Sequence, residues 1–460
     1  MKHSTSKPVR LGAFVAVVGL LTLSACGGDD DDTPAAEPTA DTEITEPTQT
    51  TAAPEETETT EPTADTDSTE PPQTTAAPED SDVELEAVTL TIPVAVQNSG
   101  PLATYSESMV NGYLLAADEI NAAGGVVVGD ARYEFEFDFI DDGGDAANGA
   151  AIVRQVVSDG DPILMGFPAS AVLSAAAPIA AESPEDLLLF PVGTLNGLTE
   201  LGENIFRNRQ PTGTPQHADA MFDVINDLAP ESLGIFLNES NPVYVALADQ
   251  VSELASDAGI SITGTQRFST GTTDFAPLVT NMRADNPTAV LIVGNPPADI
   301  AGILNEMQLQ GLDAVGITND ASLQQLMIDS AADGALNGLN SVAVPTNEVI
   351  AELGGDFSSS FFERYEAEFG ISGGTYSPSA YDDLHILAAA MAQAGSLEVP
   401  ALIAAMSELS VDDVTLVEST VISQDGLLFN DIRQVVRPYA HFVYGEDDGI
   451  PVFIGLIEPQ

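Results

Sequence analysis

Two hydroxyl side chains each follow an apolar segment predicted to be a strand. Ser170 comes after the run at 163–167, and Thr194 comes after the run at 187–190. In open α/β sheets, ligands bind beyond the carboxyl ends of the strands, where helix N-termini present N–H groups without partners. We therefore expect both hydroxyls and the neighbouring N–H groups to converge on one carboxylate or amide oxygen. A helix N-cap for Ser170 and a turn residue for Thr194 are the alternatives.

The surrounding sequence offers little for catalysis. Gly166-Phe167-Pro168-Ala169-Ser170 is not a G-x-S-x-G elbow, and the four histidines, at 3, 217, 385 and 441, show no metal-ligand spacing. No Lys occurs after Lys7, which excludes a P-loop, a Schiff-base lysine and a Ser-Lys dyad from the body of the chain. We expect a binding protein without a cofactor, and a hydrolase is a distant alternative. His217 and His385 lie in helical stretches, where surface or satisfied core histidines are expected.

One acidic cluster resembles a cation loop. It comprises Asp138, Asp141, Asp142 and Asp145, but it lacks the spacing and the terminal Glu of an EF-hand. A solvated turn is the expected structure.

The composition excludes further classes. The 460 residues include 72 Asp and Glu against 12 Lys and Arg, one Cys and no Trp. A net charge of -60 leaves almost nothing to bind nucleic-acid phosphates. One Cys excludes a disulfide framework and any multi-cysteine metal site. The acidic, lysine-free body is typical of salt-adapted secreted proteins, a hypothesis tested by its stability when salt is removed.

Alternating strands and helices must position the two hydroxyls. The body, 85–460, is longer than the roughly 250 to 300 residues that one core supports, so two lobes are expected. Period-2 and helical patterns predict an α/β fold with mostly parallel sheets. In the first lobe they predict strands at 88–96, 133–139 (edge or half-buried), 163–167 and 187–190, and helices at 106–123, 146–157 and 170–181.

The alternation restarts after Arg207. Strands are predicted at 233–237, 261–263, 289–293 and 314–318, and helices at 245–258, 275–284 and 299–310. A third stretch is predicted to contain a strand from about 340, helices at 357–369 and 380–394, and a β-rich end with 435–444 and 452–457.

Several local stretches, in this order, resemble the type I periplasmic binding proteins, in the leucine/isoleucine/valine-binding and amide/urea-binding branch that serves ABC importers. The resemblance implies two Rossmann-like lobes joined by three crossings, with the ligand in the cleft between them. The stretches that carry it are Ser99-Gly100-Pro101, Asn111-Gly112, Glu119-Ile120-Asn121, Gly124-Gly125, Asp141-Asp142, Gly166 with Ser170, Pro191 with Thr194, Phe206-Arg207, Thr273-Asp274-Phe275 and Tyr381-Asp382.

The resemblance implies roles for residues of the first lobe. Positions that match Ser170, Gly193 and Thr194 hold the ligand's carboxylate in the family. Tyr105, in a loop that enters a helix, matches an aromatic residue that lines the pocket. A core tyrosine is the alternative for Tyr105.

In the second lobe, Asp320 falls near an acid that holds the ligand's ammonium group in the family, although Asn319-Asp320 also fits a turn or cap pair. The chain departs from the pattern twice. Tyr244 is displaced within Asn241-Pro242-Val243-Tyr244, and Asn295-Pro296-Pro297 stands where relatives often carry aromatic residues. Both departures affect the second-lobe wall of the pocket.

From the resemblance we expect lobe 1 to comprise 85–208 and about 336–418, and lobe 2 about 209–335 and 419–460. The expected function is capture of a small polar solute, a branched-chain or other hydrophobic amino acid, by lobe closure, with delivery to an ABC permease. The expected protein is a monomer without a nucleic-acid partner. A ligand-sensing subunit for a signalling receptor and a binder of amide- or urea-type compounds are the alternatives.

The start of the chain has the pattern of a lipoprotein signal at 1–25. Lys2, Lys7 and Arg10 precede the apolar run at 11–23, which is shorter than the ~20 residues of a membrane span. Leu23-Ser24-Ala25-Cys26 resembles a bacterial lipobox, so we expect lipidation at Cys26 and an extracytoplasmic protein anchored to the cell membrane.

The next segment, 26–84, has the composition of a disordered tether. It is rich in Thr, Pro and acidic residues, and the block at 37–55 recurs at 61–79, a period of 24 residues. Such a sequence buries too little apolar surface to offset the entropy of ordering. We expect an acidic stalk that separates the folded body from the membrane.

Overall fold

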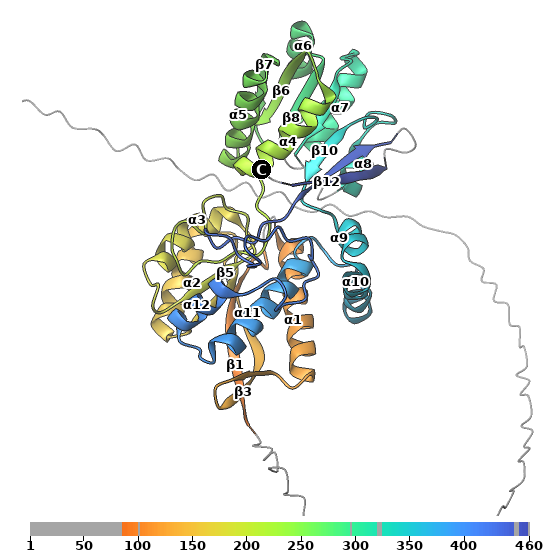
Figure 1. Cartoon of the computed structure of the whole chain (residues 1–460). Helices are drawn as coiled ribbons and strands as arrows, with labels where there is room; N and C mark the ends of the chain where they lie inside the picture. Colours follow the sequence, from red (N-terminus) through yellow and green to blue (C-terminus); the bar gives the residue numbers. More distant parts are fainter. Residues whose placement is uncertain (1–84, 100–101, 295–296, 320–323, 446–449, 459–460) are drawn as a thin grey trace, which may run out of the picture. The chain divides into compact units, whose positions relative to one another are not determined.

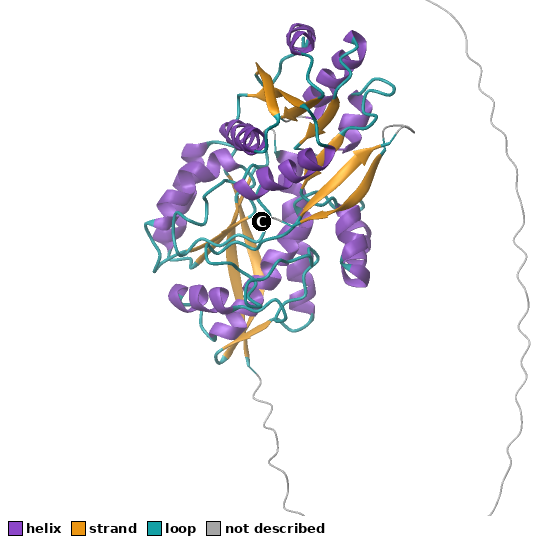
Figure 2. Cartoon of the chain, turned by 45° about the horizontal axis from the view of Figure 1, so that its top comes forward, coloured by secondary structure: helices purple, strands orange, loops and turns teal. Residues whose placement is uncertain are grey.

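The computed structural model describes residues 85–99, 102–294, 297–319, 324–445 and 450–458. In these ranges the chain forms two sheets, each covered by helices on both faces (Figures 1 and 2). The predicted signal sequence, Cys26, the tether and Asp320 lie outside the described residues.

The first sheet has five strands in the order β2-β3-β1-β4-β5, and only β2 runs antiparallel to its neighbour. Its strands are β1 (Glu86–Val96), β2 (Val126–Val128), β3 (Ala131–Asp141), β4 (Ile163–Gly166) and β5 (Leu188–Pro191). Its helices are α1 (Ala103–Ala122), α2 (Ala146–Asp159), α3 (Ser170–Ala181), α10 (Gly355–Phe369), α11 (Ser377–Ala394) and α12 (Val399–Glu408). The short helix α9 (Asn347–Leu353) packs Ile350 against this lobe and Val349 against the second sheet.

Two apolar cores enclose this sheet. One core joins side chains of α1, α11 and α12 to the sheet, and the other joins side chains of α2 and α3 to it. We refer to this sheet and its helices as the first lobe. The predicted strands and helices before Arg207 are present at nearly the predicted positions, and α3 matches its predicted range. Five elements of the structure had no predicted range: β2, α4 (Pro215–Leu228), α8 (Gln324–Ser330), α9 and α12.

The second sheet has seven strands in the order β12-β11-β10-β9-β8-β6-β7, with β11 and β12 antiparallel. Its strands are β6 (Ser232–Asn238), β7 (Ser261–Phe268), β8 (Ala289–Val293), β9 (Val315–Thr318), β10 (Asn340–Ala343), β11 (Tyr439–Tyr444) and β12 (Pro451–Ile457). Its helices are α4 (Pro215–Leu228), α5 (Pro242–Asp257), α6 (Ala276–Asp285), α7 (Pro297–Gln310) and α8 (Gln324–Ser330). With these helices it forms the second lobe.

Both sheets have a topological switch point. In the first, β1 lies between β3 and β4, and in the second, β6 lies between β7 and β8. The connections therefore leave the central strand toward opposite sides, which opens a crevice at the carboxyl ends of the strands. Ser170 follows β4 and Tyr244 follows β6, so each lies beside the switch point of its own sheet.

The chain passes between the two sheets three times: after β5, after β10 and before β11. Two expected lobe boundaries need correction. β10 pairs with β9 and β11, so the chain returns to the first lobe after Ala343 rather than at about 336. Leu428 and Val435 pack in the first-lobe core, so the stretch at 419–436 belongs to the first lobe and not to the second.

No single helix among the described residues has the length and apolar composition to cross a membrane, although α11 and α12, bent by 109°, meet that test together.

Candidate functional site

A tight turn brings the start of α3 to the switch point of the first sheet. Gly166 and Phe167 have φ values of 94° and 51°, the left-handed region that favours glycine. A Cβ at Gly166 would lie 2.2 Å from the Ala95 carbonyl oxygen, so only glycine fits beside β1. The capping position of α3 is Ala169 and Ser170 is the first helical residue. The Ser170 hydroxyl is half-buried and makes no hydrogen bond to the rest of the described chain.

The end of β5 packs against the same turn. A Cβ at Gly193 would lie 2.4 Å from Leu173 Cδ1 and 2.7 Å from the Phe167 carbonyl oxygen. The backbone at 193 and 194 therefore lies next to the first turn of α3. Thr194 follows this contact and is half-buried. The structure thus brings the loops that carry Ser170, Gly193 and Thr194 together, as the carboxylate site would require.

An aromatic pair lies beside these loops. Tyr105, in the first turns of α1, packs against Tyr376 with ring centroids 5.4 Å apart. The Tyr376 hydroxyl donates a hydrogen bond of 3.4 Å to the Pro168 carbonyl oxygen, which lies two residues before Ser170. Tyr105 is half-buried at the margin of the first-lobe core, whereas Tyr376 is buried. Tyr376 has no predicted role, yet it connects the Tyr105 helix to the α3 loop.

Arg209 packs on the Tyr376 ring of this pair. Its guanidinium carbon lies 4.3 Å from the centroid of the Tyr376 ring, within the range of a cation–π contact. Its Nη1 donates to the Thr375 carbonyl oxygen at 2.9 Å and to Ser379 Oγ at 3.4 Å. Arg209 is only 7% exposed, so a cation lies buried beside the aromatic pair.

The second lobe contributes a polar edge at its own switch point. Tyr244 lies in the first turn of α5, half-buried against the second-lobe core. Asn319 follows β9, and its Oδ1 accepts a 2.9 Å hydrogen bond from the Gly294 N–H at the end of β8. Asp320, the predicted ammonium partner, lies outside the described residues, so its predicted role stays a prediction.

A short series of contacts links the Thr194 loop to the second lobe. Asn196 Nδ2 donates to the Gly213 carbonyl oxygen at 2.5 Å. A Cβ at Gly213 would lie 2.2 Å from Val243 Cγ1, so this backbone lies against the start of α5, next to Tyr244. Arg207 Nη1 donates to the Leu195 carbonyl oxygen at 2.5 Å. The first crossing therefore contacts the proposed ligand loops directly.

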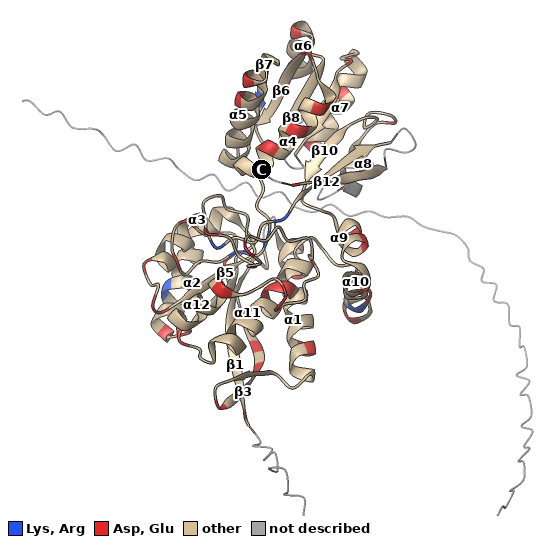
Figure 3. Cartoon of the chain, viewed as in Figure 1, with Lys and Arg blue, Asp and Glu red and all other residues tan. Residues whose placement is uncertain are grey.

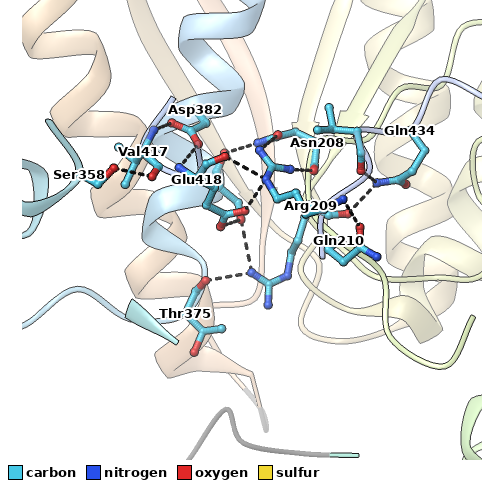
Figure 4. Close-up of polar contacts among 12 residues, drawn as sticks. Asn208, Arg209, Gln210, Ser358, Thr375, Asp382, Val417, Glu418 and Gln434 are labelled. Atoms are coloured by element: carbon cyan, nitrogen blue, oxygen red, sulfur yellow. Dashed lines mark hydrogen bonds and ion pairs between the residues drawn. The ribbon is translucent and has the colours of Figure 1, made fainter. Parts of the chain in front are cut away.

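The first and third crossings are joined by buried charges, the group we call the hinge network (Figure 4). Arg437 is 2% exposed. Its Nη1 and Nη2 donate to the carbonyl oxygen and to Oδ1 of Asn208, and its Nε lies 3.4 Å from Glu418 Oε2. Gln434 donates to the Arg209 carbonyl oxygen at 3.1 Å and accepts from Arg207 Nε at 2.5 Å. Nearly every donor of Arg437 thus has a partner.

Two carboxyl groups of α11 lie behind this network. Asp382 accepts the backbone N–H groups of Val417 and Glu418 at 2.7 and 2.9 Å. Burial, and then repulsion by Glu418, raises the pKa of Asp382 to about 8. Burial also raises the pKa of Asp383, whose Oδ2 accepts a 3.3 Å hydrogen bond from the Tyr113 hydroxyl. Asp382 therefore connects the third crossing to α11, whereas Asp383 connects α11 to α1.

His217 holds the start of the second lobe. Its Nδ1 accepts the Gly213 N–H at 3.0 Å and its Nε2 lies 2.8 Å from the Val342 carbonyl oxygen. The ring is therefore the neutral tautomer with the proton on Nε2. Its stacking on Tyr439, with centroids 4.5 Å apart, completes a fully buried site. Burial lowers the pKa of His217 to about 4, so the prediction of a satisfied core histidine is confirmed.

The acidic residues lie on the helices and loops of both lobes, and several basic residues gather where the chain crosses between the sheets (Figure 3). In the predicted solvated turn, Asp145 is exposed and caps α2 by accepting the Ala147 and Asn148 N–H groups. Asp142 is instead fully buried. Its Oδ1 accepts the Gly144 N–H, and its own N–H donates to the Val96 carbonyl oxygen. Burial raises its pKa. The prediction of a solvated turn is therefore wrong for Asp142.

Three residues near the site, Tyr376, Arg209 and Arg437, had no predicted role. Their only sequence signals were weak: an aromatic residue before α11, and arginines that remain in a chain with few cations. Each acts through partners distant in sequence, such as Arg437 with Asn208, so no local pattern could reveal it.

Comparisons with known proteins agree on one family. Residues 89–436 match the sequence model of the family described as periplasmic binding protein. A curated relative, the Leu/Ile/Val-binding protein homolog 3 of Brucella melitensis, is 26% identical over 207 residues, which are 45% of this chain and 54% of that protein. The aligned stretch thus spans about half the length of that relative.

Solved structures match over more of the chain. A leucine-binding protein from Thermotoga maritima is 18% identical, with a TM-score of 0.64 over 80% of this chain and 99% of that one. A branched-chain amino acid transporter substrate-binding protein from Streptococcus pneumoniae, in complex with isoleucine, is 19% identical, with a TM-score of 0.64 over 81% and 100%. At these identities the likeness shows the fold.

Proposed function

This chain belongs to the periplasmic binding protein family of ABC transporters, and from that premise we propose that it captures a small carboxylate-bearing solute and delivers it to an importer permease. The names of the relatives favour a branched-chain or other hydrophobic amino acid as the solute. The observation that carries the proposal is the meeting of the Ser170 and Thr194 loops at the switch point of the first sheet.

The chemistry of this edge suits a carboxylate. The first N–H groups of α3 have no intrahelical partner, and the helix dipole favours negative charge there. The Ser170 hydroxyl adds a donor that no described residue uses. Tyr105 and Tyr376 supply apolar surface next to these donors.

A few such contacts are sufficient for capture. Micromolar affinity needs about 8 kcal/mol, and each hydrogen bond to a charged group contributes about 1.5 to 3 kcal/mol. Three or four donors, together with an apolar pocket for the side chain, reach this total without covalent chemistry.

We propose that closure of the two lobes makes the bound form recognisable. The second-lobe contacts, from the Tyr244 edge and from Asp320, would form only when the lobes close. A ligand that binds the closed form better shifts the population toward it, and a permease then recognises that form. Small-angle scattering at saturating ligand should show compaction, and an unchanged radius of gyration would contradict closure.

The ligand class is tested by a thermal-shift screen of the purified protein. The set comprises hydrophobic amino acids, amides, urea and short-chain acids. Stabilisation by leucine, isoleucine or valine is expected. Stabilisation by urea and amides alone would transfer the function to the amide-binding branch.

Thr194→Val tests the site within the same screen. It keeps the shape of the side chain but removes the hydroxyl, so the affinity should fall about tenfold or more. Thr415→Val is the matched control because Thr415 is exposed and distant in sequence from the site. Equal affinities for both variants would remove Thr194 from the site.

We also propose that lipid on Cys26 anchors the protein to the cell membrane, on its extracytoplasmic side. The support is the basic, apolar and small-residue order of the first 26 residues. Replacing Cys26 with Ser should move the protein from the membrane to the soluble fraction, and unchanged fractionation would refute the anchor.

A further inference from the structure

A pocket lies where the chain crosses between the lobes. Each of the three crossings contributes to its wall, together with α9 and the loop before α11. The residues that line it are Arg209, Gln210, Val344, Pro345, Ile350, Thr375, Glu418, Thr420 and Arg437. Neither Ser170 nor Thr194 is among them, so this pocket is distinct from the proposed carboxylate loops.

Arg209 is the unusual member of this pocket. It is 7% exposed, and its Nε is buried without a hydrogen-bond partner in the described part of the chain. Toward the described residues Arg209 donates through Nη1 alone, to the Thr375 carbonyl oxygen and to Ser379 Oγ. Figure 4 shows its guanidinium directed away from Asn208 and Gln434, toward Thr375. No residue in the described part of the chain therefore accepts a hydrogen bond from Nε or Nη2 of Arg209.

The Arg209 charge has no carboxylate within ion-pair distance in the described part of the chain either. Among the described residues two ion pairs occur, Arg364 with Glu119 and Arg437 with Glu418, and Arg209 takes part in neither. The Glu418 carboxylate lies in the same pocket, but it accepts from Ser379 Oγ at 2.7 Å and faces Arg437. Ser379 stands between Glu418 and Arg209 and accepts the Arg209 donor.

A buried cation without a carboxylate partner is costly, and this chain has many carboxylates with which to satisfy one. After the tether it holds 53 acidic residues against nine Arg. The planar guanidinium fork suits a carboxylate, which can accept two parallel N–H groups. Thr420 and Gln210 add neutral polar groups beside it.

We propose that this pocket, which we call the hinge pocket, binds a carboxylate on Arg209, and that Arg209 is a specificity-determining residue. Two sources supply this chemistry: a second carboxylate on the transported solute, which rests on the proposed function, or a free small carboxylate. In both cases the occupant contacts segments from different crossings. Binding therefore favours the lobe arrangement in which these segments lie together.

The test compares acids with their neutral amides, using the full protein at constant ionic strength. The pairs are acetate with acetamide, succinate with succinamide, and L-glutamate with L-glutamine. Calorimetry and thermal unfolding should show preference for the acid in the wild type. Arg209→Gln should reduce that preference about ten- to hundredfold. Arg154→Gln, an exposed change of equal charge on α2, should leave it intact.

The outcomes separate the sources. A response to acetate identifies a free carboxylate, and a response to L-glutamate or succinate without acetate identifies the solute's own group. A preference that persists in Arg209→Gln, or no preference in the wild type, overturns the proposal. If Arg209→Gln does not fold, Arg209→Lys is used instead. It keeps the positive charge but not the planar guanidinium group, so a folded Lys variant with full acid preference also contradicts the proposal.

Failure of this inference is distinguishable from failure of the proposed function. Leucine binding that Thr194→Val weakens, without any acid preference at Arg209, leaves the function and removes the hinge site. If the protein binds no amino acid or amide but prefers acids in a way that needs Arg209, the hinge site stands and the proposed function fails.

Discussion

The ligand wall of the first lobe and the hinge network are both polar, but they use polarity differently. At the wall, around Ser170 and Thr194, the donors are neutral and one hydroxyl has no partner in the described chain. Arg437 of the hinge network, and Asp382 behind it, are charged or ionisable, buried and hydrogen-bonded to several partners. Groups with their partners in place hold the fold, and groups without partners are available to a ligand.

The largest expected effect on stability is in the hinge network. Arg437→Met would leave Glu418 and Asn208 buried without their partner, so the free energy of unfolding should fall by about 3 to 5 kcal/mol. Urea denaturation followed by circular dichroism measures the loss. Thr194→Val should barely change the same quantity.

A surface ion pair supplies the control. Arg364 pairs with Glu119 at 2.7 Å, but their side chains are 35% and 32% exposed. Solvent screens such a pair, so Arg364→Met should cost at most about 1 kcal/mol. Equal losses at Arg437 and Arg364 would show that burial does not set the difference.

The next effect is a loss of stability at low pH, and it arises from His217 at the start of the second lobe. Because burial lowers the pKa of His217 to about 4, the unfolded chain binds a proton that the folded chain excludes between pH 6.5 and about 4. Stability from the neutral ring is complete above pH 6.5 and is lost as the pH falls through this window. The loss is up to about 3 kcal/mol.

His217→Gln isolates this contribution. Chemical denaturation of both proteins at pH 7 and at pH 4.5 should show the stability advantage of the wild type shrinking at the lower pH. A difference that stays constant with pH would mean that His217 does not titrate in this window.

Apart from the control substitutions, the smallest expected effect on stability lies in the ligand wall. Gly193→Ala places a Cβ against Leu173 and the Phe167 carbonyl oxygen, so it should cost about 1 to 3 kcal/mol. By moving Thr194 it should also weaken ligand binding. Gly455→Ala in β12 is the control, because no heavy atom lies within 4 Å of its added Cβ. Unchanged affinity in Gly193→Ala would place the ligand elsewhere.

Much of the fold could be predicted because its signals are local. The apolar run at 289–293 became β8 without a change of bounds, since five consecutive apolar residues suit a strand buried on both faces. Short elements were missed for the opposite reason: β2 has three residues, and it exists because it pairs with β3. The boundary near 336 was wrong because strand pairing, which is non-local, assigns β10 to the second sheet.

The site divides in the same way. Ser170 and Thr194 could be proposed because each follows a recognisable strand, and the rule that ligands bind at strand ends needs only that order. Tyr376 could not be proposed from its neighbours, because its role depends on Tyr105 and Pro168, which are more than two hundred residues away.

The sequence by itself determined the α/β alternation, the family resemblance, the acidic and lysine-free composition, and the predicted lipobox at Cys26. Only the tertiary structure decided which charged groups are buried. Arg209, Arg364 and Arg437 are the same residue type in one acidic chain, yet one is paired at the surface, one is saturated in the hinge network and one lies buried beside a pocket. Burial and partner choice depend on contacts between distant segments, and those contacts set the energy of a charge far more than its sequence neighbours do.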